Sequence, residues 1–364
     1  MQIILDTPAF LMNPSVLDVA AQSAVEDLLR EGESANTLAS YRSALKYWAA
    51  WHAMRYGCSI QLPVPVSSVL QFIVDDAQRI TDSGLVSELP LSIDMALVNG
   101  GYKGKPGPLS HNTLVHRIAV LSKAHQVEEK TNPCQDYKIR ELLSRIRKAY
   151  AKRGVLPNKK DALTKDPLQL ILASCEDSLR GRRDRALLLF AWSSGGRRRS
   201  EVANADMKFL KRAPNGFTYT LVHSKTNQAG RERPENEKPL LGSAATAMTE
   251  WLQALGIFEG PIFRQVRKGD QLGPALAAAA VRDIVKYRSA LSGVEGNFSA
   301  HSLRSGFITE AGRQNMPLAE TMAMTGHQSV GTVVGYSRAG AALSSQVARL
   351  FDDSLQENLW SQVP

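Results

Sequence analysis

The chain has 364 residues, enough for about two domains that each bury a core. Its hydrophobic content of 43% and charged content of 22% are ordinary for a globular protein, and no apolar run reaches the about 18 residues of a membrane span, which argues against a membrane-spanning protein. A net charge of +9 and a pI near 9.4 favour a polyanionic partner, with an anionic membrane surface as the competing candidate to nucleic acid.

The N-terminal residues and the cysteines bear on location. The opening MQIILDTPAFLMNP lacks the basic start and small-residue cleavage site of a signal peptide. Cys58, Cys134 and Cys175 are odd in number, far apart and without a CxxC pair, which is typical of thiols in a reducing compartment. We therefore expect a cytoplasmic protein.

The first half of the chain predicts a loose arm, residues 1–14, followed by helices over residues 15–152. Apolar residues recur at helical spacing in residues 15–32, in residues 34–57, and from Ser67 and Ser110 onward. One face of the second helix carries a stripe of larger side chains, Leu38, Tyr41, Leu45, Trp48 and His52. Residues 82–109 are weakly patterned, so we expect a mobile loop there or a short helix.

The last helix of this half, residues 134–152, has a strongly basic flank: Lys138, Arg140, Arg145, Arg147, Lys148 and Lys152. Such a flank fits contact with the DNA backbone, and Arg145, Arg147 and Lys148 are the DNA-binding candidates on this helix. A merely solvated face is the alternative. Residues 153–161, which include Lys159 and Lys160 as further candidates, predict an interdomain linker. Extended, it reaches roughly 25 Å, about the width of a DNA duplex, so the two domains could clamp DNA.

The second half predicts a mainly helical domain with a small antiparallel sheet. The sequence ALLLFAW (residues 186–192) is apolar nearly all round and predicts a buried core helix. The turn Ser193-Ser-Gly-Gly196 then leads into Arg197-Arg-Arg-Ser-Glu201. Residues 217–224 alternate as a strand does, followed by a turn with Lys225, and residues 244–255 and 271–290 predict helices.

Four groups suited to phosphoryl transfer lie within residues 300–340. His301 and Arg304 are three residues apart, which places them on one helix face; His327 and Tyr336 come later in the chain. An Arg fork binds the non-bridging oxygens of a phosphodiester, and a tyrosine can act as a covalent nucleophile when nearby cations stabilise its anion. Singly, each of these residues is more often a surface or packing residue.

Together, His301-x-x-Arg304, Gly326-His327 and Tyr336 nine residues later resemble the C-terminal signature of the tyrosine recombinases, the phage integrase family that includes Cre- and Xer-like proteins. The resemblance covers most of residues 34–352 and is specific at six or seven positions. The implied fold is mainly α with a small antiparallel β-sheet in the C-terminal domain. The resemblance also implies a helical core-binding domain, residues 15–152, which begins with a Thr37-x-x-x-Tyr41 helix, and a catalytic domain, residues 162–364.

The family pattern also extends the set of site residues. Its register implies that Arg198 is a catalytic arginine supported by Glu201, whereas Arg197 and Arg199 contact phosphates or water. Lys225, in a predicted hairpin turn, resembles the general acid of the family. An amphipathic helix at about residues 341–352 resembles the exchange helix that related recombinases dock on a neighbouring protomer, which implies a homo-oligomer, a tetramer on two paired sites of double-stranded DNA.

The implied reaction is site-specific recombination. Tyr336 attacks the scissile phosphate to give a 3′-phosphotyrosine, while Arg198 and Arg304 bind the non-bridging oxygens of that phosphate. His301 handles the proton of the tyrosine, and Lys225 protonates the leaving oxygen. His327 forms a hydrogen bond to the phosphate. One ester replaces another, so we expect no cofactor and no metal.

Three alternatives use the same residues differently. A type IB topoisomerase has the same groups but relaxes DNA as a monomer, which leaves the apolar C-terminal helix unexplained. A non-catalytic basic DNA-binding protein explains the charge but not Tyr336 or the His301/Arg304 pair. Zinc binding by His223, His301 and His327 lacks a Cys or carboxylate at ligand spacing.

Overall fold

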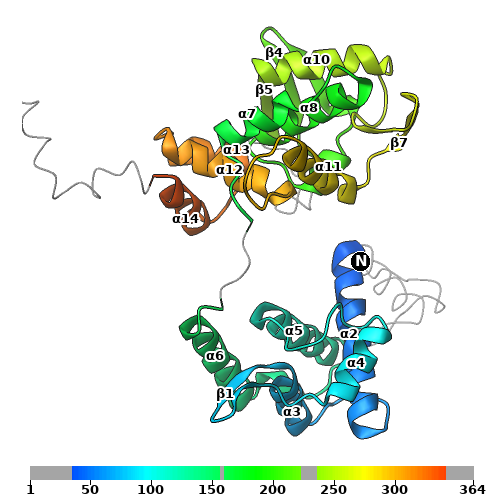
Figure 1. Ribbon diagram of the computed structural model, residues 1–364, viewed down its shortest axis with the longest axis vertical. Coiled ribbons are helices and arrows are strands. Elements are labelled where there is room, and N and C mark those ends of the chain that lie inside the picture. The colour runs from blue at the N-terminus through cyan, green and yellow to red at the C-terminus, as the bar shows by residue number, and fades with distance from the viewer. Residues whose placement is uncertain (1–34, 156–159, 223–235, 342–364) are drawn as a thin grey trace, which may run out of the picture. The chain divides into compact units, whose positions relative to one another are not determined.

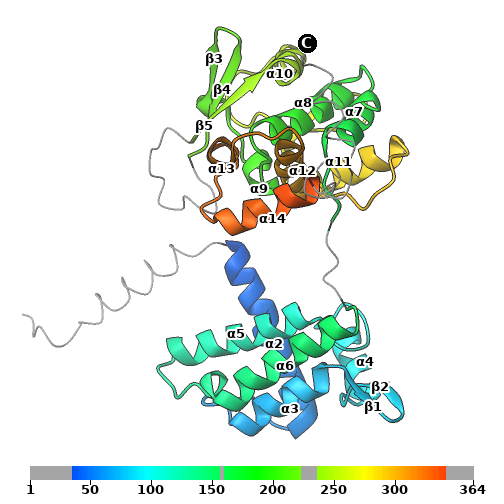
Figure 2. The ribbon, with the colours of Figure 1, turned by 90° about the vertical axis from the view of Figure 1, so that its left-hand side faces the viewer.

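The structure is a computed structural model that describes residues 35–155, 160–222 and 236–341 (Figures 1 and 2). The chain forms two compact units that divide between Pro157 and Asn158, a point within the stretch where a linker is predicted. The predicted arm, the helix predicted over residues 15–32 and all but the first residue of the predicted exchange helix lie outside the described residues.

The first unit is built of helices and one two-stranded hairpin. Its elements are α2 (Ala35–Tyr56), α3 (Val66–Asp76), β1 (Arg79–Thr81), β2 (Gly84–Val86), α4 (Leu91–Asn99), α5 (His111–Val127) and α6 (Tyr137–Lys152). The start predicted at Ser110 is confirmed, because its side chain accepts the backbone N–H of Thr113 at 3.2 Å and caps α5. Similarly, Asp136 caps α6 by accepting the N–H of Lys138 at 2.8 Å.

Aromatic side chains of α2 form the centre of the core of this unit. Trp48 stacks on Phe72 of α3 with ring centroids 3.6 Å apart, and Trp51 meets the same ring edge-on at 5.0 Å. Leu45, which belongs to the stripe predicted for this helix, is 40% exposed. The face of α2 that packs into the core is therefore the one that carries Trp48 and Trp51, whose rings bury more apolar area than a leucine does.

Residues 82–109, predicted as a loop with room for a short helix, are more ordered than that. The chain reverses at residues 82–83 between β1 and β2, which pair antiparallel with Thr81 opposite Gly84. Gly84 has φ +107°, a conformation that glycine adopts without strain. Pro90, with φ −56°, immediately precedes the short helix α4. The ring of proline holds φ near this value, which is compatible with the start of a helix.

The second unit is mainly helical, with a three-stranded antiparallel sheet in the order β3-β4-β5, which confirms the predicted fold class. Its helices are α7 (Lys165–Ala173), α8 (Leu179–Ser193), α9 (Arg199–Ala203), α10 (Ser243–Leu255), α11 (Ala278–Leu291), α12 (Ala300–Arg313), α13 (Leu318–Thr325) and α14 (Val330–Ala341). Its strands are β3 (Leu210–Ala213), β4 (Gly216–Thr220), β5 (Glu237–Leu241), β6 (Arg264–Val266) and β7 (Leu272–Ala275).

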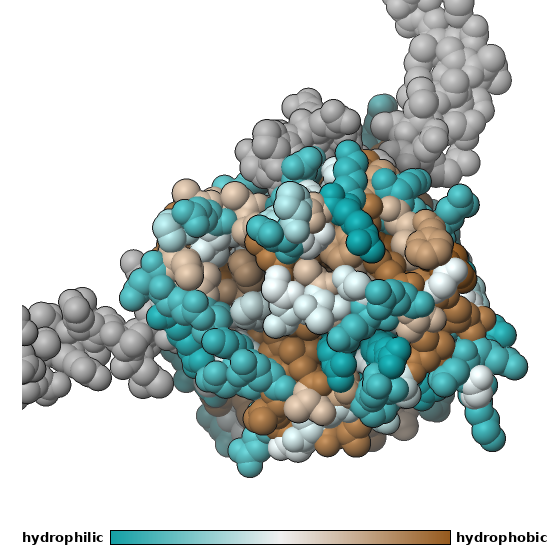
Figure 3. Space-filling view, turned by 90° about the horizontal axis from the view of Figure 1, so that it is seen from above, coloured by the Kyte–Doolittle hydropathy of each residue, from teal (hydrophilic) through white to brown (hydrophobic). Residues whose placement is uncertain are grey.

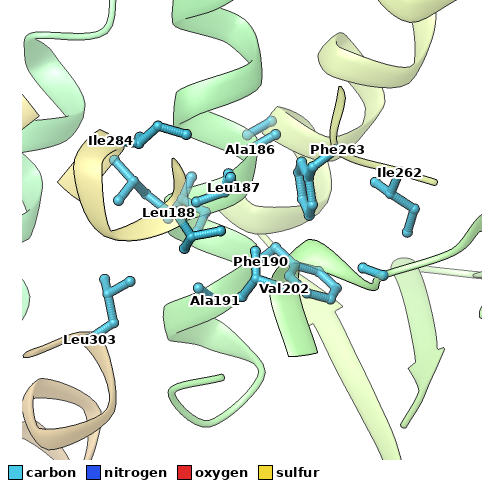
Figure 4. Packing of buried hydrophobic residues seen from close by; sticks show 14 of the residues in the cluster. Ala186, Leu187, Leu188, Phe190, Ala191, Val202, Ile262, Phe263, Ile284 and Leu303 are labelled. Atoms are coloured by element: carbon cyan, nitrogen blue, oxygen red, sulfur yellow. The ribbon is translucent and has the colours of Figure 1, made fainter. Parts of the chain in front are cut away.

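Helix α8 is the centre of the core in the second unit, as its apolar sequence predicts. Its residues 186–191 are all buried, and α9, α11, α12 and the segment before β6 pack around them (Figure 4). The ring of Phe190 lies edge-on to Tyr219 of β4 at 5.1 Å and to Phe263 at 5.4 Å. This packing fixes the end of α8, from which the Gly195-Gly196 turn departs.

The helix predicted over residues 271–290 is wrong in its first turns. Residues 272–275 form β7, which pairs with β6, and α11 begins at Ala278. Pro274 has no backbone N–H, and a residue before proline is disfavoured in the α region, so Gly273-Pro274 keeps this stretch extended.

The surface mixes polar and apolar residues, and helix α6 carries a set of exposed basic side chains. Hydrophilic residues interrupt hydrophobic ones over the face drawn in Figure 3. Among the described helices, none is both long and apolar enough to cross a membrane. On α6, the basic residues predicted to share a flank are all exposed: Lys138, Arg140, Arg145, Arg147, Lys148 and Lys152.

Candidate active site

Helix α12 supplies the first two groups of the site. Its N-terminus is fixed by a capping box in which the Ser299 N–H donates to the Ser302 hydroxyl at 2.9 Å. One turn further, Arg304 is 4% exposed, whereas His301 is exposed. The spacing of three therefore places an internal guanidinium directly beside an accessible imidazole.

The glycine turn after α8 lies against Arg304. Arg304 Nη1 donates to the carbonyl of Gly196 at 3.1 Å. A Cβ on Gly196, where φ is +71°, would lie 2.3 Å from the Cα of Arg304, and a Cβ on Gly195 would lie 2.2 Å from the carbonyl oxygen of Met324. Two glycines are needed here because any side chain would separate α12 and α13 from this turn.

Arg198 follows this turn directly and is held by Glu201. Its backbone N–H donates to one carboxylate oxygen of Glu201 at 3.0 Å, and its Nη1 donates to the other at 2.7 Å. Glu201 is buried, whereas about a quarter of the Arg198 side chain, 27%, is exposed. The carboxylate thus orients a guanidinium that still reaches the surface.

His327 lies immediately beyond the C-terminal end of α13, after Gly326 in the left-handed conformation at φ +67°. Thr325 donates its hydroxyl proton to the carbonyl of Thr321 at 2.8 Å, so it accepts from His327 Nδ1–H at 2.8 Å. Arg304 Nη2 donates to the carbonyl of Thr325 at 2.6 Å and lies 3.2 Å from both ring nitrogens of His327. With the proton on Nδ1, Nε2 is the acceptor.

Tyr336 comes from α14, which packs along α12 (Figure 2). Its hydroxyl lies 3.4 Å from Nε2 of His301, and its side chain is partly exposed. Groups 35 residues apart in the sequence therefore meet at one point on the surface.

The electrostatics of the site are dominated by positive charge. Burial, followed by the charges of Arg197 and Arg198, lowers the pKa of Arg304 to about 9. Burial and then the charge of Arg304 lower the pKa of His327 to about 4, and partial desolvation followed by Arg304 lowers that of His301. In the described part of the chain, Glu201 is the one carboxylate that pairs with these guanidinium groups. The site therefore has an excess of cations and two neutral imidazoles, a combination that attracts an anion.

Arg197, one of the predicted DNA contacts, is buried in the structure. Arg197 is 2% exposed and donates through Nη2 to the carbonyls of Gly195 at 3.3 Å and Met324 at 2.7 Å. Its guanidinium points inward because the glycine turn places its Cα beside the end of α13, so it is not available at the surface. Arg199, the other neighbour of Arg198, is exposed.

The remaining predicted residues fall in different places. Arg147 and Lys148 are exposed on α6, and Arg145, exposed too, pairs with Glu141 at 2.6 Å. Lys160 donates to the side-chain oxygen of Asn297. Lys159, His223 and Lys225 lie outside the described residues.

Two residues of the site have no counterpart in the predictions. Lys238 of β5 is buried, and its Nζ donates to the carbonyl of Ala323 at 2.7 Å, while Thr325 fixes the tautomer of His327. In β5 the buried residues alternate with exposed ones, and Lys238 shares the inward face with Leu240. The sequence EKPLL does not show this alternation, since the outward residues include Leu241 and the inward ones Lys238, so no local signal identifies the inward lysine.

Comparison with known proteins gives the family. The phage integrase family matches residues 161–342 of this chain. An integrase/recombinase XerD homolog from Selenomonas ruminantium is 30% identical over 242 residues, which cover 63% of this chain and 69% of that protein. Tyrosine recombinase XerC from Pseudomonas putida (strain W619) is 29% identical over 178 residues, which cover 47% and 52% respectively.

Solved structures show the same fold. A lambda integrase fragment, a dimer bound to a COC′ core site, has a TM-score of 0.52 at 16% identity and covers 87% of this chain and 93% of that one. Lambda integrase bound to DNA has a TM-score of 0.50 at 16% identity, with coverage of 84% and 90%. With half of its length matched by the family and an XerD homolog at 30% identity, this chain belongs to the phage integrase family of tyrosine recombinases.

Proposed function

We propose that this protein is a site-specific DNA recombinase that cuts and rejoins double-stranded DNA through a 3′-phosphotyrosine intermediate. The observation that carries the proposal is the position of the Tyr336 hydroxyl, which lies 3.4 Å from Nε2 of His301. His301 is on α12, and Arg304 of the same helix lies near the guanidinium groups of Arg197 and Arg198. A phenol beside a neutral base and next to excess positive charge has what a nucleophile for a phosphodiester needs.

The phosphate is bound by Arg198 and Arg304. Arg304 uses two of its N–H groups on the carbonyls of Gly196 and Thr325, which fixes the plane of the guanidinium before DNA arrives. Arg198 is oriented in the same way by Glu201. Such preorganised donors stabilise the charge that develops on the non-bridging oxygens without reorganisation at the moment of reaction.

The cleavage step moves one proton to the enzyme and one to the DNA. His301, neutral because its pKa is lowered, takes the proton of Tyr336 as the phenolic oxygen attacks the phosphorus. The bond to the 5′ oxygen breaks, and Lys225 supplies the proton to this leaving group. Attack by the 5′-hydroxyl of a partner strand reverses the same steps and releases Tyr336.

His327 can bind the phosphate only with a second proton. Its Nδ1–H is committed to Thr325, so Nε2 becomes a donor only in the imidazolium form. In the DNA-free protein burial and then the neighbouring Arg304 oppose that charge, but a phosphodiester anion placed beside both residues favours it. We infer that DNA binding and protonation of His327 are coupled.

The two units divide the work. The exposed basic face of α6 fits the DNA backbone, so we assign residues 15–152 to a core-binding domain, residues 153–161 to the linker, and residues 162–364 to the catalytic domain. The helix predicted at residues 341–352 joins protomers into a tetramer on two paired sites. A type IB topoisomerase is the alternative that uses the same reaction.

The test is to map the covalent junction. Protein with Tyr336→Phe is used to select a duplex from a random-sequence pool, and wild-type protein is then incubated with a nicked form of that duplex, which traps the cleaved strand. An SDS-resistant adduct at Tyr336, absent in Tyr336→Phe while DNA binding persists, is expected. An adduct at another tyrosine, for example Tyr41, Tyr150 or Tyr287, or no adduct at all, contradicts the proposal.

A further inference from the structure

Three cationic side chains converge on one end of α13. The carbonyl oxygens of residues 323–325 accept, in order, Lys238 Nζ at 2.7 Å, Arg197 Nη2 at 2.7 Å and Arg304 Nη2 at 2.6 Å. The three donors come from β5, from the turn before α9 and from α12. No two of them are neighbours in sequence.

This convergence bears on His327, which lies two residues beyond Thr325 and depends on the last turn of α13 for its position. The last carbonyls of a helix have no partner within it and carry partial negative charge, so cations stabilise them. Helix α13 has only eight residues, too short for much stability of its own. The three cations therefore stabilise the turn that places His327.

The hydrogen bond from Arg197 to the carbonyl of Met324 requires burial of the guanidinium charge, which costs free energy. Its side chain is buried, its Nε has no hydrogen-bond partner among the described residues, and its Nη1 is 3.8 Å from Glu201. Burying a guanidinium with so little compensation is expensive, and an apolar side chain of similar size would avoid that expense. The charge also acts on the site, because it lowers the pKa of both Arg304 and His327.

We propose that Arg197 is a positioning residue for the recombination reaction: it holds the carbonyl of Met324, and thereby the turn that places His327 and orients Arg304, without contacting DNA. Lys238 supports the same turn from β5. This proposal rests on the proposed function, but its two measurements separate the two claims.

The first measurement compares DNA binding with cleavage. Arg197→Met removes the donors but keeps an unbranched side chain. We expect it to leave the Kd for the selected duplex and its salt dependence unchanged, while single-turnover cleavage of bound duplex slows by up to about 10²-fold, the effect of a misplaced group. The matched control is Arg199→Met, which removes the exposed neighbour. There we expect weaker DNA binding, with a salt slope lower by about 0.9 if one phosphate contact is lost.

The second measurement needs no DNA. The His327 Cε1 proton, assigned by its loss in His327→Gln, is titrated by NMR in the free protein. In Arg197→Met the pKa of His327 should rise by a small but measurable amount above about 4, because burial, Arg304 and Arg198 still lower it but the charge of Arg197 is gone. Arg197→Lys, which keeps the charge and can reach one carbonyl, should keep that pKa low and restore part of the cleavage rate.

Several outcomes would overturn the proposal. Weaker DNA binding by Arg197→Met with a normal rate on bound duplex would assign Arg197 to the DNA. An unchanged rate and an unchanged His327 titration would leave it a packing residue only. If Arg197→Met does not fold, Arg197→Lys decides the question. A normal rate of cleavage by Arg197→Lys together with a shifted pKa of His327 would contradict the positioning role. If wild-type protein forms no adduct, the recombinase function fails, while the titration still tests the effect of Arg197 on His327.

Discussion

Gly196 and Arg304 are in backbone contact: a Cβ added to Gly196 would lie 2.3 Å from the Cα of Arg304, closer than two such atoms can approach. The turn after α8 and the helix that carries Arg304 are thus joined without an intervening side chain. The hydrogen bond from Arg304 Nη1 to the Gly196 carbonyl uses that closeness.

Gly196→Ala should therefore destabilise the protein and slow cleavage. The positive φ alone costs roughly 1–2 kcal/mol, and the clash with backbone atoms, which cannot rotate away, adds to it. Gly256→Ala is the matched control, because Gly256 has φ +63° and open space around a Cβ, so only the conformational cost applies. Thermal denaturation of both variants measures the difference. Equal losses of stability would contradict the contact.

The pH dependence of cleavage should reveal His301 as the base. Its pKa is lowered from the ordinary 6.5, so the neutral, proton-accepting form predominates already below pH 6.5 and is lost as the pH falls through the lowered value. The second-order rate constant of cleavage, measured below saturation so that it reports the DNA-free protein, should thus reach its plateau below pH 6.5 and decline in more acid solution. His301→Gln should be slower and lack this acid limb. An identical limb in both proteins would assign it to another group.

Lys225→Ala should slow cleavage of a normal phosphodiester by about 10²–10⁴, the range for loss of a general acid. A substrate with sulfur at the 5′ bridging position has a leaving group that needs no proton, so its cleavage should be largely spared. The ratio of the two single-turnover rates, variant against wild type, is the measurement. Equal losses on both substrates would make Lys225 a binding residue.

Deleting residues 341–364 should separate DNA binding from assembly. The basic face of α6 is untouched, so binding to a single site should persist, whereas pairing of two sites and recombination should fail. If this predicted helix docks on a neighbouring protomer, burial of Leu343, Val347 and Leu350 would contribute roughly 1.5–3 kcal/mol each. Light scattering of DNA complexes, with and without these residues, gives the stoichiometry. Wild-type complexes of one protomer per DNA that relax supercoils would favour the topoisomerase.

Local sequence determined several described helices of this protein and one face of its site. The placement of His301 and Arg304 on one face of α12 is set by a spacing of three and a serine cap, both of which act within a single helical turn. In the same way, the continuous apolar run of residues 186–191 predicted the buried helix α8. These features depend on hydrogen bonds and periodicity between near neighbours, so the amino-acid sequence contains them.

Only the tertiary structure decided which arginines face the solvent. Arg197, Arg198 and Arg199 are consecutive and chemically identical, yet the first is buried, the second is partly exposed and the third is exposed. The difference arises because the partner of Arg197 is the carbonyl of Met324, 127 residues away. Lys238, 85 residues from its acceptor at Ala323, is a second case. These backbone carbonyls come within reach of their donors only after α13 has packed against the glycine turn. No local sequence pattern therefore predicts the contacts.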